Sequence, residues 1–307
     1  MHSPSFLKPG DTIRIIATAR KISAEELAPA LQIFAEWGLQ VVLGKNVFAQ
    51  ENQFAGNDNQ RASDLQEALD DPSCSAIICA RGGYGTVRII DDVSWKGFIE
   101  KPKWVIGYSD VSVLHNSLQK LNFASLHATM PINFSSNSSD SLALLQDALF
   151  GKTYQIQAPA HPFNRLGQVA GEIIGGNLSM LYSCLGSPSA LNTQDKILFL
   201  EDLDEYLYHI DRMMVNLRRN GYFTGIKALV IGTMGAMNDN AIPFGENAPN
   251  IIARHARAFR FPIAFGLPVG HQSHNLPLVF GEKVTLEVNS DASILNFNYG
   301  RKSWFRN

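Results

Sequence analysis

The chain has 307 residues and a formal net charge of -2, with 45% hydrophobic and 18% charged residues. This length favours two domains, and the composition excludes a disordered chain because there are enough apolar residues to form a core. The slightly negative charge argues against nucleic acid as a partner. No signal peptide is evident, and no apolar run approaches the roughly 20 residues that span a membrane, which argues against a membrane protein.

The first half of the chain alternates segments that are typical of strands with segments that are typical of helices. The strands are predicted at residues 11–19, 39–44, 75–80, 103–107 and 123–128. The helices are predicted at residues 23–38, 58–71 and 110–121. Ser23 and Glu26 have the spacing of a capping box at the start of the first helix. Strands separated by helices pair in parallel, so we expect an α/β fold with a doubly wound sheet.

The pattern changes near residue 150, where prolines and polar residues replace the helical period. We therefore expect a first domain at residues 1–150, a linker at 151–167 and a second domain at 168–307. In the second domain the sequence predicts, in order, a strand with a glycine turn and a helix (171–186), a strand with an acidic turn and a long helix (196–221), a buried strand (226–235) and short β segments (255–289).

The cysteines bear on the redox environment of the protein. Cys74, Cys79 and Cys184 are an odd number and lack the spacing of a metal site. A reduced, cytoplasmic protein is the simplest interpretation.

A serine lies where the strand at 103–107 meets the next helix. The sequence Gly107-Tyr108-Ser109-Asp110-Val111 resembles the G-x-S-x-G nucleophile elbow, except that Val111 replaces the second glycine. The amide of Asp110 would lie at the positive end of the helix dipole, where an oxyanion is stabilised. Ser109 or Asp110 could instead cap the helix, and these residues taken alone favour the cap.

The sequence RGGYG (81–85) follows the predicted strand at 75–80 and has three glycines in four positions. Its backbone amides could reach a ligand and supply an oxyanion donor or bind phosphate. It matches neither the dinucleotide-binding fingerprint nor a P-loop. A tight turn with close packing is an equally good interpretation.

A serine nucleophile needs a base, and the chain has eight histidines. His271 follows a strand and a Pro/Gly turn, in the kind of loop that carries catalytic groups. His274 lies three residues on, but no third metal ligand accompanies this pair. His127 ends an apolar segment and is expected to be buried, whereas His255 lies on a helical pattern expected to be exposed. A lone histidine is more often structural than catalytic.

The base needs a group that orients it, and Glu201 and Asp202 end the predicted strand ILFLED. An acid at the end of a strand lies at the edge of the sheet, where it could hold His271. The alternative is that it complements the dipole of the helix that follows.

Taken together, five stretches resemble the LD-carboxypeptidase family of serine peptidases. In family order they are RGGYGTVRIID, IGYSDVSVLH, GGNLSMLYSCLGSP, LFLEDLDEYLYHIDRMM and GLPVGHQSHNLPLVFG. The resemblance implies a flavodoxin-like N-terminal domain, a smaller β-rich α+β C-terminal domain and a site between them. It also implies a Ser-Glu-His triad without metal or cofactor. The residues implied are Ser109 as nucleophile, Glu201 as orienting acid, His271 as base, and an oxyanion hole from the amides of Asp110 and Gly83, with Gly82 as the alternative to Gly83.

The family acts on murein tetrapeptide in the cytoplasm and releases its terminal D-Ala during peptidoglycan recycling, and its members are often homodimers. One alternative is a peptidase of the microcin-immunity type, which hydrolyses aminoacyl-nucleotide conjugates, although no insertion for a nucleotide is evident. An α/β-hydrolase esterase is disfavoured by the missing second elbow glycine. A non-catalytic flavodoxin-like binding module would leave Ser109, Glu201 and His271 far apart.

Overall fold

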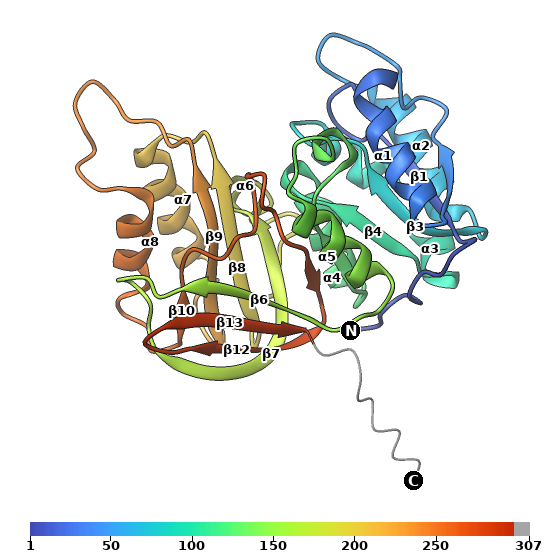
Figure 1. Cartoon of the computed structure of the whole chain (residues 1–307). Coiled ribbons are helices and arrows are strands. Elements are labelled where there is room, and N and C mark those ends of the chain that lie inside the picture. Colours follow the sequence, from blue (N-terminus) through green and yellow to red (C-terminus); the bar gives the residue numbers. More distant parts are fainter. Residues whose placement is uncertain (298–307) are drawn as a thin grey trace.

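The computed structural model describes residues 1–297 and contains two β-sheets that lie side by side, each flanked by helices (Figure 1). The helices are α1 (Ala24–Glu36), α2 (Asp58–Asp70), α3 (Lys96–Glu100), α4 (Ser112–Lys120), α5 (Ser139–Leu149), α6 (Leu178–Ser183), α7 (Leu207–Arg219) and α8 (Ala248–Ala256). None of the helices in this described part is long and apolar enough to cross a membrane.

The first sheet has the order β11-β5-β4-β3-β1-β2. Its strands are β1 (Thr12–Ile16), β2 (Gln40–Leu43), β3 (Cys74–Cys79), β4 (Trp104–Gly107), β5 (Ser125–His127) and β11 (Leu278–Phe280). The first five are parallel and follow the order 2-1-3-4-5 of flavodoxin-like sheets, as predicted. Strands β3 and β4 are buried almost throughout, because helices cover both faces of such a sheet.

Local sequence signals place the first two helices as expected. The capping box of α1 is present, since the amide of Glu26 donates to Ser23 Oγ and the amide of Ser23 donates to Glu26 Oε2. Helix α2 has the same arrangement between Asn57 and Gln60, and it ends before Pro72. These caps satisfy amide groups that have no partner within the helix.

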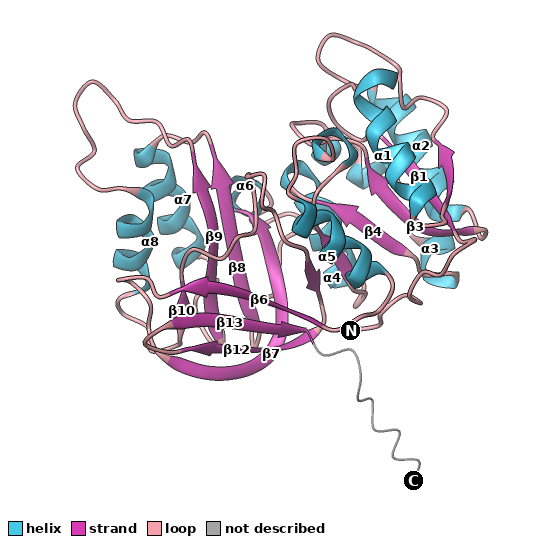
Figure 2. Cartoon of the chain, in the orientation of Figure 1, coloured by secondary structure: helices cyan, strands magenta, loops and turns pink. Residues whose placement is uncertain are grey.

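The second sheet has the order β10-β9-β8-β7-β12-β13-β6. Its strands are β6 (Tyr154–Pro159), β7 (Gly167–Asn177), β8 (Ile197–Leu203), β9 (Ala228–Gly235), β10 (Ile263–Ala264), β12 (Lys283–Val288) and β13 (Ala292–Phe297). Strands β7 to β10 are parallel, and β12, β13 and β6 continue the sheet in antiparallel fashion. Figure 2 shows β7 as a long curved strand that belongs to both parts of this sheet.

Four features differ from the expectations. Strand β6 forms inside the expected linker and pairs with β13, and β11, from the second half, completes the first sheet. Helices α3 and α5 were not predicted, whereas α8 contains the helical pattern expected at His255. The glycines expected to form a turn at 175–176 instead lie within β7.

One of those glycines, Gly176, lets the two sheets approach each other. Gly176 has φ +144°, and a Cβ there would lie 2.5 Å from Ser112 Oγ at the start of α4. The same hydroxyl accepts a hydrogen bond from the amide of Asn177 at 3.0 Å, and Asn177 pairs with Glu201 in the sheet. The start of α4 and the end of β8 are thereby held close together. One apolar cluster also runs through both sheets, from Ile106 to Phe199.

Candidate active site

Ser109 lies on a sharp turn between β4 and α4. Its φ of +64° is in the left-handed region, which is unusual for a residue other than glycine and is found at nucleophile elbows. A Cβ at Gly107 would lie 2.9 Å from Val111 Cγ2, so the side chain of Val111 fills the space that Gly107 leaves open. The turn therefore tolerates valine at the position of the second elbow glycine because the first one is retained.

The alternative in which Ser109 or Asp110 caps the helix is wrong. A turn of 3₁₀-helix at Ser109–Val111 precedes α4, and no side chain caps either element. The carboxylate of Asp110 is buried and accepts a hydrogen bond from the amide of Thr86 at 2.8 Å, and burial raises the pKa of this carboxyl. Asp110 thus ties the start of the helix to the segment after RGGYG.

The RGGYG segment passes directly over Ser109. A Cβ at Gly82 would lie 3.1 Å from the Ser109 Cβ and 3.3 Å from its Oγ, so this approach favours a glycine. Gly83 has φ +112° and lies against the side chain of Arg20. The segment is therefore more than a turn, since two of its glycines line the same cavity as Ser109.

His271 and Glu201 form a hydrogen-bonded pair in the second half of the chain. Glu201 lies in the buried part of β8 and is itself fully buried, and its Oε2 lies 2.7 Å from His271 Nδ1. Gly270 makes this pairing possible, because with φ +121° a Cβ there would lie 2.7 Å from Glu201 Oε2 and 2.4 Å from Thr233 Oγ1. The other ring nitrogen, Nε2, is left available for a proton.

The surroundings of His271 set its proton affinity. Burial by itself lowers the pKa of His271, but the negative charge of Glu201, their hydrogen bond and the nearby Asp202 outweigh it and raise the pKa above 6.5. Burial and the charge of Glu201 also raise the pKa of Asp202 to about 7, although amides of Asn177 and Leu203 donate to it. Two acids beneath His271 thus stabilise its protonated form.

Ser109 and His271 line one cavity of about 230 Å³. The ring of Tyr108 lies 4.7 Å from that of His271, and its hydroxyl donates to Asn133 Oδ1 at 3.2 Å. The remaining lining residues are Arg20, Arg81, Gly82, Gly83, Met130, Ile132, Asn133 and Leu203. In the described part of the chain no hydrogen bond joins Ser109 to His271, and such bonds are often long before substrate binds.

The sequence interpretation missed Arg20, Tyr108 and Asn133. The available signal was position, because Arg20 follows β1 and Asn133 follows β5 at the carboxyl edge of the parallel sheet, where ligands bind. Asn177 does not line this cavity; it caps α6 and donates to Asp202.

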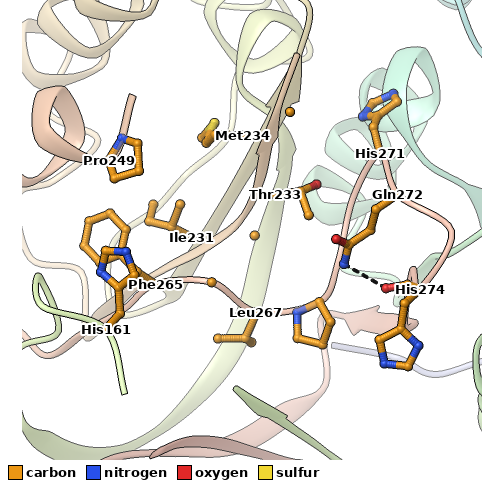
Figure 3. Close-up of a pocket in the computed structure, with 14 residues that line it drawn as sticks. His161, Ile231, Thr233, Met234, Pro249, Phe265, Leu267, His271, Gln272 and His274 are labelled. Carbon is orange, nitrogen blue, oxygen red and sulfur yellow. Dashed lines mark hydrogen bonds between the residues drawn. The ribbon is translucent and has the colours of Figure 1, made fainter. Parts of the chain in front are cut away.

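A second, larger depression of about 540 Å³ also has His271 in its lining (Figure 3). Its floor is mainly apolar, with Ile231 and Phe265 beside His161, while Gln272 and His274 stand at its edge. His274 Nδ1 lies 2.9 Å from Ser138 Oγ, and among residues 1–297 no cluster of three His, Cys, Asp or Glu side chains could hold a metal ion. His271 therefore lines both a small cavity and a wider, mainly apolar one.

Two other histidines have structural surroundings. His127 is fully buried, as expected, and burial holds its pKa well below 6.5. The expectation that His255 is exposed was wrong, since α8 packs on α7 and His255 Nε2 lies 2.7 Å from Asp211.

Comparisons with known proteins place this chain in a family. The LD-carboxypeptidase N-terminal domain matches residues 13–128, and the LD-carboxypeptidase C-terminal domain matches residues 170–286. The chain belongs to the LD-carboxypeptidase family. It is therefore an enzyme, a peptidase, and the alternative of a non-catalytic binding module does not hold.

Several relatives of this LD-carboxypeptidase align over nearly their whole length. A probable murein peptide carboxypeptidase of Bacillus subtilis is 30% identical over 306 residues, covering 96% of this chain and 94% of the relative. The murein tetrapeptide carboxypeptidase of Pseudomonas aeruginosa is 28% identical, covering 90% of this chain and 93% of the relative.

Solved structures agree with the two-sheet fold of this LD-carboxypeptidase. The muramoyltetrapeptide carboxypeptidase of Oxalobacter formigenes superposes with a TM-score of 0.84 at 26% identity, covering 93% of this chain and 98% of that one. The microcin C7 self-immunity protein MccF, in complex with glutamyl sulfamoyl guanosine, also has a TM-score of 0.84, at 18% identity, covering 96% and 98%. At that identity the MccF match supports the fold alone.

Proposed function

We propose that this LD-carboxypeptidase releases the terminal D-Ala from murein tetrapeptide, by cleaving an L,D-amide bond through an acyl-enzyme. The observation that carries the proposal is that a histidine bonded to a buried glutamate lines one small cavity with a serine at positive φ. This arrangement suits a nucleophile and an oriented base. The names of the relatives support the substrate.

In the proposed mechanism, His271 Nε2 takes the proton of Ser109 as Oγ attacks the carbonyl carbon of the L-residue. Glu201 accepts a hydrogen bond from Nδ1–H and so fixes the tautomer that leaves Nε2 free. The amides of Asp110 and Gly83 donate to the oxyanion, and the loss of one such donor typically costs about 10²–10³ in rate.

Collapse of the tetrahedral intermediate breaks the amide bond. His271 gives its proton to the leaving amine, and D-Ala departs with a free amino group. A water molecule, deprotonated by His271, then attacks the acyl-enzyme and regenerates the hydroxyl of Ser109. Each step needs only protein groups and water, so the proposed reaction uses no metal or cofactor.

The same proposal includes a cytoplasmic location and a homodimer. The three cysteines support a reducing compartment, since all are free and buried. The dimer rests on the resemblance alone. Cell fractionation tests the location, and light scattering coupled to size-exclusion chromatography tests the dimer; a monomeric mass would contradict it.

The direct test incubates the enzyme and its Ser109→Ala variant with murein tetrapeptide and detects D-Ala by mass spectrometry. We expect release by the enzyme and none by the variant, because alanine has no nucleophile. Undiminished release by the variant would remove Ser109 from the mechanism. An aminoacyl sulfamoyl nucleoside is assayed in parallel, and its cleavage in place of the tetrapeptide would favour the microcin-immunity reaction.

A further inference from the structure

One cation at the Ser109 cavity has no role in the proposed chemistry. Arg20 follows β1, is exposed, and lines the cavity together with Ser109 and His271. The stem of its side chain lies against Gly83, where a Cβ would be 2.6 Å from Arg20 Cδ and 2.8 Å from Nε. Gly83 therefore gives Arg20 the space to lie beside the proposed oxyanion donor.

The guanidinium of Arg20 has no ion pair and no hydrogen-bond partner among residues 1–297. The other arginine of this cavity differs. Arg81 donates to the carbonyl of Lys21 at 3.3 Å and lies 3.8 Å from Glu26. Two arginines thus line the cavity, and the unpaired one, Arg20, has all its donors available for a ligand.

The geometry points to Arg20 as the group that binds the terminal carboxylate of the substrate. This inference rests on the proposed function, because a carboxypeptidase must distinguish a free chain end from an internal amide. A planar guanidinium matches a carboxylate with two parallel hydrogen bonds, which fix the orientation as well as the charge.

The sizes of the two cavities support this placement. The residue that leaves as D-Ala is small and ends in a carboxylate, which suits the polar space of about 230 Å³ around Arg20. The longer peptide on the other side of the scissile bond needs more room, which the depression of about 540 Å³ also lined by His271 provides. His271 borders both spaces, as a base that serves the scissile bond should.

Binding is measured by calorimetry in the Ser109→Ala background, so that the peptide is not consumed. The two ligands are murein tetrapeptide and the same peptide with a C-terminal carboxamide. We expect Arg20→Gln to weaken binding of the free acid by about 10- to 100-fold and to leave binding of the carboxamide unchanged. Arg20→Lys, which keeps the charge without the planar fork, should give an intermediate loss.

Arg81→Gln is the matched control, because Arg81 lines the same cavity but already has partners. It should preserve the preference for the free acid over the carboxamide. In the active enzyme, Arg20→Gln should raise KM for the tetrapeptide more than it lowers kcat. Thermal unfolding of each variant checks that the exposed substitutions leave the fold intact.

Two results would overturn the assignment of Arg20. An equal loss for acid and carboxamide would mean that Arg20 binds another part of the peptide, and no loss for either would mean that it does not bind. If the wild-type enzyme also releases no D-Ala and the Ser109→Ala variant binds neither peptide, the proposed substrate itself is wrong. If the wild-type enzyme releases D-Ala and the Arg20→Gln variant keeps the preference for the free acid over the carboxamide, the assignment of Arg20 alone is wrong.

Discussion

The Glu201→Gln variant tests the proposed triad at its most buried member. Glutamine has nearly the same shape, but its amide can donate to His271 Nδ1, which selects the tautomer with Nε2 protonated. That tautomer cannot take the proton of Ser109. Because Glu201 is 0% exposed and Oε2 makes its one hydrogen bond to the ring, water cannot restore the interaction. We expect kcat to fall by about 10⁴, equivalent to about 5 kcal/mol of activation free energy.

The assay is the rate of D-Ala release at saturating tetrapeptide. Asp211→Asn is the matched control, since it also removes the charge of a carboxylate that holds a buried histidine, His255, but outside both cavities. The control should lose stability without a comparable loss of kcat. A Glu201→Gln enzyme that keeps its fold and works within tenfold of the wild-type rate would refute the role of Glu201.

Three further predictions concern His271, Gly270 and Lys103. We expect kcat/KM to rise with pH over a range centred above pH 6.5, because the base must be neutral and the pKa of His271 is raised. In the Glu201→Gln variant this rise should occur at lower pH, and an unchanged position would contradict the assignment of Glu201. The Gly270→Ala variant should have a lower kcat and a free energy of unfolding lower by about 1–3 kcal/mol. The reason is that residue 270 has a positive φ and that an alanine Cβ there would collide with Glu201. Unchanged kinetics and an unchanged denaturant unfolding curve would contradict this explanation. The Lys103→Met variant should have a free energy of unfolding lower by about 1–3 kcal/mol and an unchanged kcat. The reason is that Lys103 Nζ donates hydrogen bonds to three backbone carbonyls at the end of α2. An unaltered denaturation midpoint would show that water replaces the lysine amine at these carbonyls.

Local signals explain why much of the first sheet could be predicted. A capping box such as Ser23 with Glu26 involves four consecutive positions, so the sequence contains the whole interaction. Strands separated by helices also restrict the topology strongly, because the crossover between parallel strands is nearly always right-handed. The doubly wound sheet was predicted from the alternation of strands and helices, and the strand order confirms it.

Strands that depend on distant partners could not be predicted in the same way. Strand β6 alternates buried and exposed residues, but the surrounding prolines and its short length concealed this period. Strand β11 is three residues long and antiparallel to β5, and no local pattern indicates which sheet it joins. Its place is decided by packing against residues more than a hundred positions away.

The candidate site, like the fold, could be predicted only where the signal is local in the sequence. Residue patterns identified Ser109 as an elbow or a cap, but could not rank eight histidines, because burial and partners are properties of the fold. His255 looks exposed on its own helix and becomes buried only when α8 meets α7. Glu201 and His271 were selected through the family resemblance. Arg20 carries no motif, and only the folded cavity sets it apart.

Strand β11 also bears on the order in which the enzyme matures during synthesis. Pairing between residues so distant in sequence forms late, because a long loop must close before the contact stabilises it. The loop with His271 ends just before β11, so it is held at both ends only after this strand docks beside β5. A nascent chain therefore contains Ser109 long before it contains His271, so we expect the proposed catalytic pair to form only after β11 has docked.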